Sequence, residues 1–187
     1  MWQFIPSTGK NYKLQQNWWF DQRRDVVAST SAALDYLQYI YEMHGDWHLA
    51  LASYNWGEGA VGRAIAKNRA KGLPTDYLHL NMPGETRYYV PKLQAIKNII
   101  AQPQLFGLTL DPIPNRPYFG TVERSGNMDI VLAARLAEIP VDEFIALNPA
   151  YSRPVMPRAA NSPLVLPAEK VQTFLDNLQS HEAQDKP

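Results

Sequence analysis

Apolar side chains recur every three or four residues through the first half of the chain, which is the spacing of amphipathic helices. The clearest stretch runs over residues 25–44, where Asp25 can cap the helix N-terminus and Gly45 can stop the helix. Asp46 predicts the start of a second helix, which ends at the Tyr-Asn-Trp-Gly turn of residues 54–57.

Two more helices follow from the same spacing. One is predicted over residues 58–71 and stops at Gly72, and the other begins near Glu85 and reaches about residue 100. Pro91 is tolerated only in the first turn of this last helix or at a kink, because it lacks a backbone N–H. The first half of the chain is therefore predicted to be all-helical.

After residue 119 the pattern changes to short apolar runs separated by short helical stretches. The order of these elements predicts a small β-α-α-β unit followed by a terminal helix. The expected strands cover residues 120–123 and 163–167, and the expected helices cover residues 129–137, 141–147 and 169–178.

A proline-rich segment separates the two halves. All five Trp lie before it, and most of the 15 Pro lie within or after it, as expected for two differently built modules. The predicted organisation is a helical domain over residues 1–102, a semi-rigid linker over 103–119, a βααβ module over 120–168, and a terminal helix and tail over 169–187.

Composition narrows the function classes. The chain has 187 residues, 45% of them apolar, which is enough for a packed core. Its formal net charge of zero argues against nucleic acid as a partner. Because it has no Cys, disulfides and thiolate metal sites are excluded. No apolar run reaches the roughly 20 residues of a transmembrane helix, and the N-terminus lacks the pattern of a signal peptide.

The sequence gives little support for a metal site or a nucleotide-binding site. His44 and His48 have the spacing of two ligands on one helical face, but Gly45 and Asp46 favour a helix break between them. The glycines of residues 57–62 lack the preceding strand of a nucleotide-binding fingerprint. We therefore expect neither a metal ion nor an organic cofactor.

Polar and aromatic residues gather at the predicted helix ends, a composition that suits a saccharide, whose ring faces stack on aromatic side chains and whose hydroxyls need amides and carboxylates. The candidate groups are Gln3, Tyr54, Asn55, Glu85, Tyr88 and Tyr89. Stacking surfaces could come from Trp2, Trp18, Trp19, Trp47 and Trp56, of which we expect about three to be core residues.

Glycoside chemistry also needs a carboxyl group that acts as an acid. The helical half offers three glutamates: Glu42 on a solvated helix face, and Glu58 and Glu85 at helix starts, where a negative charge suits the helix dipole. Composition and spacing thus leave a possible glycan cleft without an identified acid.

Four motifs resemble those of the lytic transglycosylases with the goose-type-lysozyme-like fold. They are MWQFIPSTG (residues 1–9), DQRRDVVA (21–28), SYNWGEG (53–59) and ETRYYV (85–90), and they occur in the family's order and spacing over about residues 1–102. The resemblance implies a mainly α fold class, with an incomplete lysozyme-like helical transglycosylase domain at the N-terminus.

The resemblance also implies an activity, which is cleavage of the β-1,4 bond between N-acetylmuramic acid (MurNAc) and N-acetylglucosamine (GlcNAc) of peptidoglycan to give a 1,6-anhydromuramoyl end. One glutamate then serves as acid and as base. The partner is the peptidoglycan glycan strand, and the location is the periplasm, with the parent protein anchored to the outer membrane.

Matching by position gives Gln3, Tyr54, Asn55, Glu85 and Tyr89 as substrate-binding residues. The family's catalytic glutamate belongs to a Glu-Ser motif upstream of the Gln3 segment, so it is expected before residue 1. No catalytic residue is therefore assigned here. The 187-residue chain is expected to be an N-terminally truncated fragment that binds glycan without cleaving it.

Residues 121–167 resemble a lysin-motif module, a small glycan-binding α+β unit. Gly126 to Asp129 depart from the usual Gly-Asp-Thr-Leu turn of that module, so a structural role remains an alternative to glycan binding. Two further alternatives stay open for the whole chain: a non-catalytic peptidoglycan-binding pseudo-enzyme, and a hydrolase that uses Glu58 or Glu85 as its acid.

Overall fold

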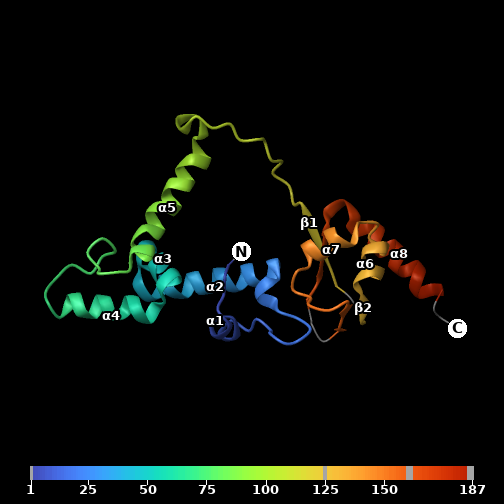
Figure 1. Cartoon of the computed structure of the whole chain (residues 1–187), viewed down its shortest axis with the longest axis horizontal. Coiled ribbons are helices and arrows are strands. Elements are labelled where there is room, and N and C mark those ends of the chain that lie inside the picture. Colours follow the sequence, from blue (N-terminus) through green and yellow to red (C-terminus); the bar gives the residue numbers. More distant parts are fainter. Residues whose placement is uncertain (1, 124–125, 159–161, 185–187) are drawn as a thin grey trace. The chain divides into compact units, whose positions relative to one another are not determined.

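The computed structural model describes residues 2–123, 126–158 and 162–184 (Figure 1). This part of the chain is mainly helical and contains two small antiparallel sheets, which confirms the predicted fold class. Two compact units are present, one of residues 33–114 and the other of residues 1–32 together with 115–187. Met1 of the first motif and the last three residues of the predicted tail lie outside the described residues.

Helices form most of the unit of residues 33–114. They are the end of α2 (Val26–His44), α3 (Trp47–Trp56), α4 (Glu58–Arg69) and α5 (Gly84–Ala101). Helix α3 packs against both α4 and α5. A short 3₁₀ helix (Pro103–Phe106) follows α5 and opens the predicted linker, whose residues 107–118 are exposed.

The helix ends lie close to where the caps and glycines predict them. Oδ1 of Asp25 accepts hydrogen bonds from the N–H groups of residues 27 and 28, and Oδ1 of Asp46 accepts one from Leu49 at 2.9 Å. Gly45 and Gly57 have φ values of 64° and 93°, which end α2 and α3 in the left-handed region. The predicted turn over residues 54–57 is wrong in its extent, because α3 continues to residue 56.

A small apolar core joins α3, α4 and α5. Its buried members are Leu49, Ala52, Val61, Tyr77, Leu80, Met82 and Val90. Three of them come from the loop between α4 and α5, which Asn68 holds in place: its side-chain amide donates to the carbonyls of Pro74 at 2.8 Å and His79 at 3.0 Å. The polar Asn68 thus folds an irregular segment into an apolar core.

Pro91 lies in the interior of α5, beyond the first turn, which was one of the two places that the sequence allows for it. A proline at this position cannot donate to the carbonyl four residues earlier, that of Arg87. The Tyr77 hydroxyl lies 2.8 Å from the Arg87 carbonyl oxygen and 2.9 Å from that of Thr86. Tyr77 therefore supplies the donor that Pro91 lacks.

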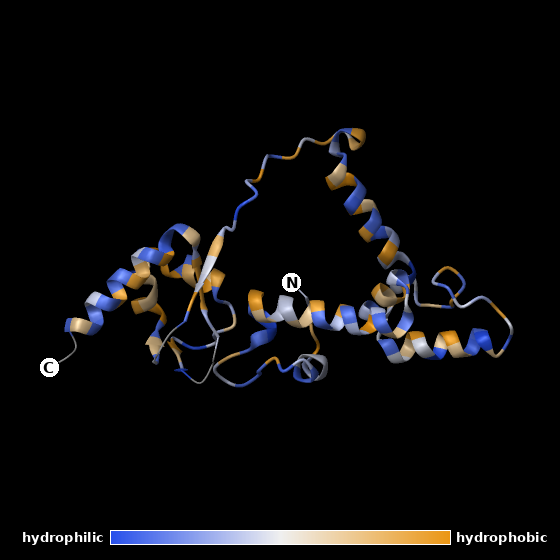
Figure 2. Cartoon of the chain, turned by 180° about the vertical axis from the view of Figure 1, so that it is seen from behind, coloured by the Kyte–Doolittle hydropathy of each residue, from blue (hydrophilic) through white to orange (hydrophobic). Residues whose placement is uncertain are grey.

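The C-terminal half of α5 exposes apolar side chains. Leu93, Ile96 and Ile100 follow helical spacing, and all three are exposed, whereas the buried residues of this helix, Thr86 and Val90, lie in its first turns. Figure 2 shows apolar and polar positions alternating along this helix.

The C-terminal module has the predicted β-α-α-β order, with a final helix. Its elements are β1 (Phe119–Val122), β2 (Met128–Asp129), α6 (Ile130–Leu136), α7 (Val141–Leu147), β3 (Val155–Met156), β4 (Leu164–Pro167) and α8 (Val171–Gln184). β1 pairs antiparallel with β4, and β2 pairs antiparallel with β3. The second pair was not predicted, because two-residue strands leave no periodic signal.

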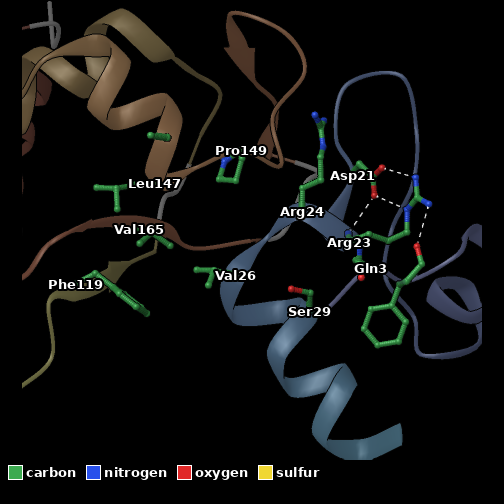
Figure 3. A pocket seen from close by; sticks show the side chains of 12 residues that line it. Gln3, Asp21, Arg23, Arg24, Val26, Ser29, Phe119, Leu147, Pro149 and Val165 are labelled. Carbon is green, nitrogen blue, oxygen red and sulfur yellow. Dashed lines mark hydrogen bonds and ion pairs between the residues drawn. The ribbon is translucent and has the colours of Figure 1, made fainter. Parts of the chain in front are cut away.

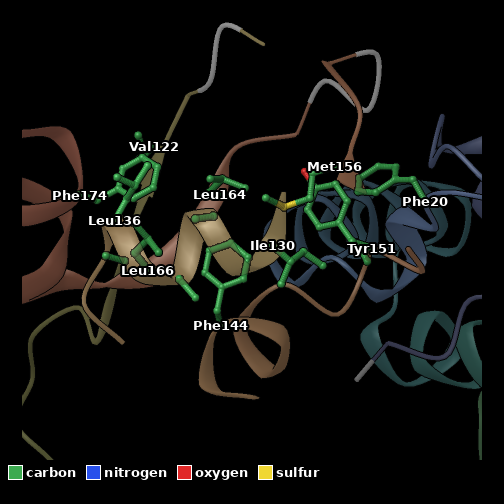
Figure 4. Close-up of a cluster of buried hydrophobic side chains, with 14 residues drawn as sticks. Phe20, Val122, Ile130, Leu136, Phe144, Tyr151, Met156, Leu164, Leu166 and Phe174 are labelled. Carbon is green, nitrogen blue, oxygen red and sulfur yellow. The ribbon is translucent and has the colours of Figure 1, made fainter. Parts of the chain in front are cut away.

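The core of this unit includes a residue from the N-terminal part of the chain. Phe20 is fully buried among side chains of the C-terminal module, with its ring centroid 4.9 Å from that of Tyr151 (Figure 4). The other large members of the cluster are Val122, Ile130, Leu136, Phe144, Met156, Leu164, Leu166 and Phe174.

Backbone pairing fixes the Phe20 segment to the module. The Asp21 N–H donates to the Ala150 carbonyl, and the Ser152 N–H donates to the Trp19 carbonyl, both at 2.9 Å. Residues 1–32, which also contain α1 (Pro6–Asn11) and a 3₁₀ helix (Gln22–Arg24), therefore belong to the compact unit of the module. The packing groups them differently from the predicted domain of residues 1–102, whose boundaries remain a prediction.

None of the described helices combines the length and the apolar character that crossing a membrane requires.

Candidate functional site

Four of the five predicted site residues lie on two helices that pack together. Tyr54 and Asn55 are in the last turn of α3, and Glu85 and Tyr89 are in the first turns of α5. The contact between these helices brings together residues about thirty positions apart in the chain. Gln3 belongs to the other compact unit.

The Asn55 side-chain amide is held from both ends by α5. Its Oδ1 accepts a hydrogen bond from the Thr86 hydroxyl at 2.9 Å, and its Nδ2 donates to Glu85 Oε1 at 3.4 Å. Thr86 is 2% exposed, so the first of these bonds is shielded from water. The arrangement fixes the amide orientation and leaves Glu85 at the exposed edge of the site.

Thr86 was missed as a site residue. It follows Glu85 directly in the ETR motif, but only Glu85 of this pair was predicted to bind substrate. A threonine on the apolar face of an amphipathic helix was the available signal, since a buried hydroxyl needs a hydrogen-bond partner.

Tyr54 lies beside two other tyrosines. Its ring centroid is 5.5 Å from that of Tyr36, at an angle of 41°. Burial raises the pKa of the Tyr54 hydroxyl above its usual value of 10.0, and the proximity of Tyr89 raises this pKa further. The Tyr54 hydroxyl therefore stays protonated at neutral pH and can act as a hydrogen-bond donor.

Tyr36 connects this site to Glu58. Its hydroxyl donates to Oε2 of Glu58 at 2.6 Å, which links α2 to the first turn of α4. Tyr36 is buried and was also missed by the sequence analysis, which considered only the carboxyl group of this pair. Glu58 is thus engaged as an acceptor within the protein.

His44 lies at the end of α2 with Nε2 2.8 Å from the hydroxyl oxygen of Ser53. Burial lowers the pKa of His44 below its usual value of 6.5, and the nearby Asp46 partly opposes this effect. His48 is on the next helix, α3, as the predicted break requires. Within the described residues, no three His, Cys, Asp or Glu side chains are placed to hold a metal ion.

Gln3 has an unusual backbone and lines a pocket. Its φ of 55° lies in the left-handed region, which costs a non-glycine residue roughly 1 kcal/mol or more. The pocket has a volume of about 680 Å³ and lies within the unit of residues 1–32 and 115–187 (Figure 3). Its walls come from the N-terminal part of the chain on one side and from the C-terminal module on the other.

The five Trp side chains divide into two groups. Trp18, Trp19 and Trp47 are exposed, although Trp47 stacks on Tyr41 with a centroid distance of 4.4 Å. Trp56 packs against the core of its unit, and the indole N–H of Trp2 donates to the Thr30 hydroxyl at 2.8 Å. Three Trp side chains are thus exposed, although Arg153 lies over the Trp18 ring at 4.1 Å from its centroid.

Comparison with known proteins identifies both halves. Residues 1–75 match the sequence model of the transglycosylase SLT domain, and residues 118–183 match that of the LysM-like domain of the lytic transglycosylase MltD. The second match confirms the predicted lysin-motif-like module.

Full-length relatives agree with these matches. The membrane-bound lytic murein transglycosylase D of Escherichia coli (strain K12) is 36% identical over 183 residues, which cover 97% of this chain and 40% of that protein. The protein of the same name from Escherichia coli O6:H1 (strain CFT073) gives the same values. A putative tributyltin chloride resistance protein of Alteromonas sp. (strain M-1) is 43% identical over 75 residues, which cover 40% of this chain and 36% of that protein.

The chain spans 40% of the length of the two transglycosylase D proteins that it matches. The two matched domains occur in the order that the motifs and the fold predict. The chain therefore belongs to the lytic transglycosylase family, with a transglycosylase SLT domain in its N-terminal part and an MltD-type LysM-like domain in its C-terminal part.

Proposed function

We propose that this chain carries the glycan-binding part of a peptidoglycan lytic transglycosylase whose full-length form cleaves the MurNAc-β-1,4-GlcNAc bond and leaves a 1,6-anhydromuramoyl end. The observation that carries this proposal is the hydrogen-bonded set formed by Asn55, Thr86 and Glu85. It orients polar groups from two helices toward one exposed edge, which suits a ligand rich in hydroxyl groups. The periplasm is the proposed compartment, with the longer protein anchored to the outer membrane.

The proposed substrate-binding residues are Gln3, Tyr54, Asn55, Glu85 and Tyr89. Tyr54 supplies a protonated hydroxyl, Asn55 supplies an amide of fixed orientation, and Glu85 supplies an exposed acceptor. These groups cover both the donors and the acceptors that sugar hydroxyls and N-acetyl groups need. The corresponding domains are proposed at residues 1–102 and 120–168, with the linker between them and the terminal helix and tail after them.

The contacts of the two candidate acids support a chain that binds glycan without cleaving it. Glu58 accepts from Tyr36, and Glu85 accepts from Asn55. Both carboxylates therefore hold the site together, and the catalytic acid is proposed to come from a glutamate outside these 187 residues. A non-catalytic peptidoglycan-binding protein that uses the same residues is the second candidate, because both glutamates of the site accept hydrogen bonds within the protein.

The test is to incubate the purified chain with peptidoglycan sacculi and to identify the released muropeptides by mass spectrometry. Escherichia coli lytic transglycosylase D serves as the positive control, and a version of this chain extended upstream by the natural coding sequence is assayed in parallel. Anhydromuramoyl products from the extended version alone support the proposal. Products from the 187-residue chain itself overturn the proposed inactivity, and Glu85 and Glu58 are then the carboxylates to replace.

If neither version releases products but both bind sacculi in a pull-down assay, the second candidate is correct. Reducing ends in place of anhydro ends point to a hydrolase and contradict both candidates, because a hydrolase uses water as the acceptor.

A further inference from the structure

The pocket beside Gln3 has a side that carries polar groups and a facing side that is apolar, formed by aliphatic residues and one aromatic ring. The N-terminal part of the chain supplies all the polar side chains of the lining, together with the apolar Phe4 and Val26; the polar ones are Gln3, Asp21, Arg23, Arg24 and Ser29. The facing wall, from the C-terminal module, consists of Phe119, Ala146, Leu147, Pro149 and Val165 (Figure 3). A volume of about 680 Å³ is within the range of small-molecule pockets.

The two arginines that line the pocket differ in how many of their N–H donors are used within the protein. Arg23 directs Nε and Nη2 to Asp21, at 3.0 and 2.7 Å, and Nη1 to the Phe4 carbonyl at 3.3 Å. Its charge is therefore compensated, and its donors are used within the protein. Asp21 in turn is occupied by Arg23, so this ion pair adds no net charge to the pocket.

Arg24 is the pocket cation whose other N–H groups can still donate to a ligand. Among the contacts of the described residues, its bonds to the Ala150 carbonyl at 3.3 Å and to the Ser152 hydroxyl at 2.6 Å both use Nη2. A guanidinium has five N–H donors, so the remaining ones can bind a carboxylate. The two bonds also hold the side chain in place, which reduces the entropy lost when a ligand binds.

The carboxylate of Asp25, the next residue, does not compete for Arg24. Asp25 is buried, and its oxygens accept hydrogen bonds from the start of α2 and from Ser162. The lining thus has two cations, Arg23 and Arg24, and one carboxylate, Asp21, and combines this excess of positive charge with an apolar wall. This composition fits an anionic ligand that carries small apolar groups.

A sugar ring fits this pocket less well than a peptide. Saccharide hydroxyls need polar partners around the ring, whereas the polar groups here lie on one side only, and buried hydroxyls without partners are costly. A short peptide with alkyl side chains and a free carboxylate matches both sides. The left-handed backbone of Gln3 at the rim is a second sign of a functional position, since such strain concentrates at ligand sites.

We infer that this pocket binds the peptide stem of the peptidoglycan substrate, with Arg24 holding a stem carboxylate and the wall of Leu147 and Val165 holding a small apolar side chain. The inference rests on the proposed function, because the peptide stem is attached to the glycan strand that the other site residues are proposed to bind. It gives the C-terminal module a direct part in selecting the substrate.

The test compares two probes by isothermal titration calorimetry on the 187-residue protein: a disaccharide-tetrapeptide muropeptide, and the same disaccharide after an amidase has removed the peptide. We expect the muropeptide to bind about tenfold more tightly, the value of one good charge-assisted contact. Ala146→Trp fills the pocket and should abolish this preference. Ile145→Trp, at an exposed neighbouring position outside the lining, should keep it.

A second set of three variants tests the contribution of the Arg24 charge to binding. Arg24→Gln should lose the preference for the peptide, while Arg24→Lys should keep a part of it, and Arg116→Gln in the exposed linker should behave as wild type. Equal melting temperatures by circular dichroism must accompany each comparison. A preference that survives in both Ala146→Trp and Arg24→Gln overturns the inference.

The outcomes also separate this inference from the proposed function. If wild type binds both probes equally, the pocket inference is wrong and glycan binding stands. The free tetrapeptide is titrated as a third probe. If wild type binds this tetrapeptide but not the peptide-free disaccharide, the pocket inference stands and the proposed glycan function fails.

Discussion

Asp25 and Ser162 form a buried contact between residues 137 positions apart in the sequence. The Ser162 hydroxyl donates to Oδ2 of Asp25, while Oδ1 of the same carboxylate caps α2. One side chain therefore starts a helix and also ties that helix to the C-terminal module. Both functions depend on a carboxylate that is 7% exposed.

Replacement of Asp25 by Ala should remove both interactions. We expect a loss of roughly 2–4 kcal/mol in the free energy of unfolding, the sum of a cap and a buried hydrogen bond to a charged group. Ser162→Ala leaves the cap intact and should cost about 1–3 kcal/mol. Urea denaturation measures both values, and an equal loss in the two variants would show that the cap contributes nothing.

Phe20→Ala should destabilise the C-terminal module, although residue 20 lies about a hundred positions before it. A fully buried phenylalanine typically contributes about 3–5 kcal/mol. Trp18→Ala is the comparison variant, because Trp18 lies two residues away and is 73% exposed; it removes a surface contact with Arg153, at 4.1 Å from the ring centroid, and should cost much less. Amide hydrogen exchange on α6 and α7 measures the effect. Unchanged protection in Phe20→Ala would contradict the packing described here.

Tyr77→Phe should destabilise the helical unit because it leaves the Arg87 carbonyl without its donor. The expected cost is about 1–3 kcal/mol, the value of an unsatisfied buried polar group. Pro91→Ala restores the backbone N–H that normally bonds this carbonyl. Tyr77→Phe should therefore cost less in the Pro91→Ala background. A double-mutant cycle with urea denaturation measures this coupling, and strict additivity would rule out the proposed compensation.

His44 should make the stability depend on pH near neutrality. Its pKa in the folded chain is lowered by burial, so the unfolded chain binds the proton more readily. The stabilising contribution of neutral His44 is present above the unfolded pKa of about 6.5 and is lost as the pH falls through the lower folded value. His44→Gln should flatten the dependence of the unfolding free energy on pH between about 7 and 5.

An NMR titration of the His44 ring offers a direct check, and an apparent pKa at or above 6.5 would contradict the assigned cause.

Replacement of Tyr54 or Tyr89 by Phe should weaken glycan binding through the loss of one hydroxyl contact. We expect a cost of about 0.5–1.5 kcal/mol in binding free energy for each variant. Tyr39→Phe, at an exposed position on α2, should bind as wild type. Calorimetry with a peptide-free glycan oligomer measures these affinities, and unchanged binding in both site variants would exclude these tyrosines from the site.

Local signals explain most of what could be predicted of the fold. Asp25 and Asp46 cap helices because their side chains bond N–H groups two or three residues away, which a sequence pattern reveals directly. Gly45 and Gly57 end helices for an equally local reason. The donor that replaces the missing N–H of Pro91 could not be predicted, because this donor, Tyr77, comes from a separate loop.

Long-range packing was beyond the reach of these patterns. Phe20 reads as one aromatic residue among several, and nothing near it in the sequence indicates that it enters the core of a module that begins a hundred residues later. Likewise, Tyr36 and Thr86 contribute to the candidate site through partners about 20 to 30 residues away. The candidate site residues on α3 and α5 are exposed or half-buried, and the buried Thr86 and Tyr36 that contact the site were missed.

The burial of Phe20 has a consequence for how such modules can be exchanged between genes. A recombination event or an engineered fusion that transfers only residues 118–183 transfers the side chains that surround the Phe20 ring, but it does not transfer Phe20. The transferred module would then have an unfilled apolar cavity at the place where the Phe20 ring packs. To remain stable, it would need a residue of the new protein that fills this cavity, or the segment around Phe20 would have to be transferred with it.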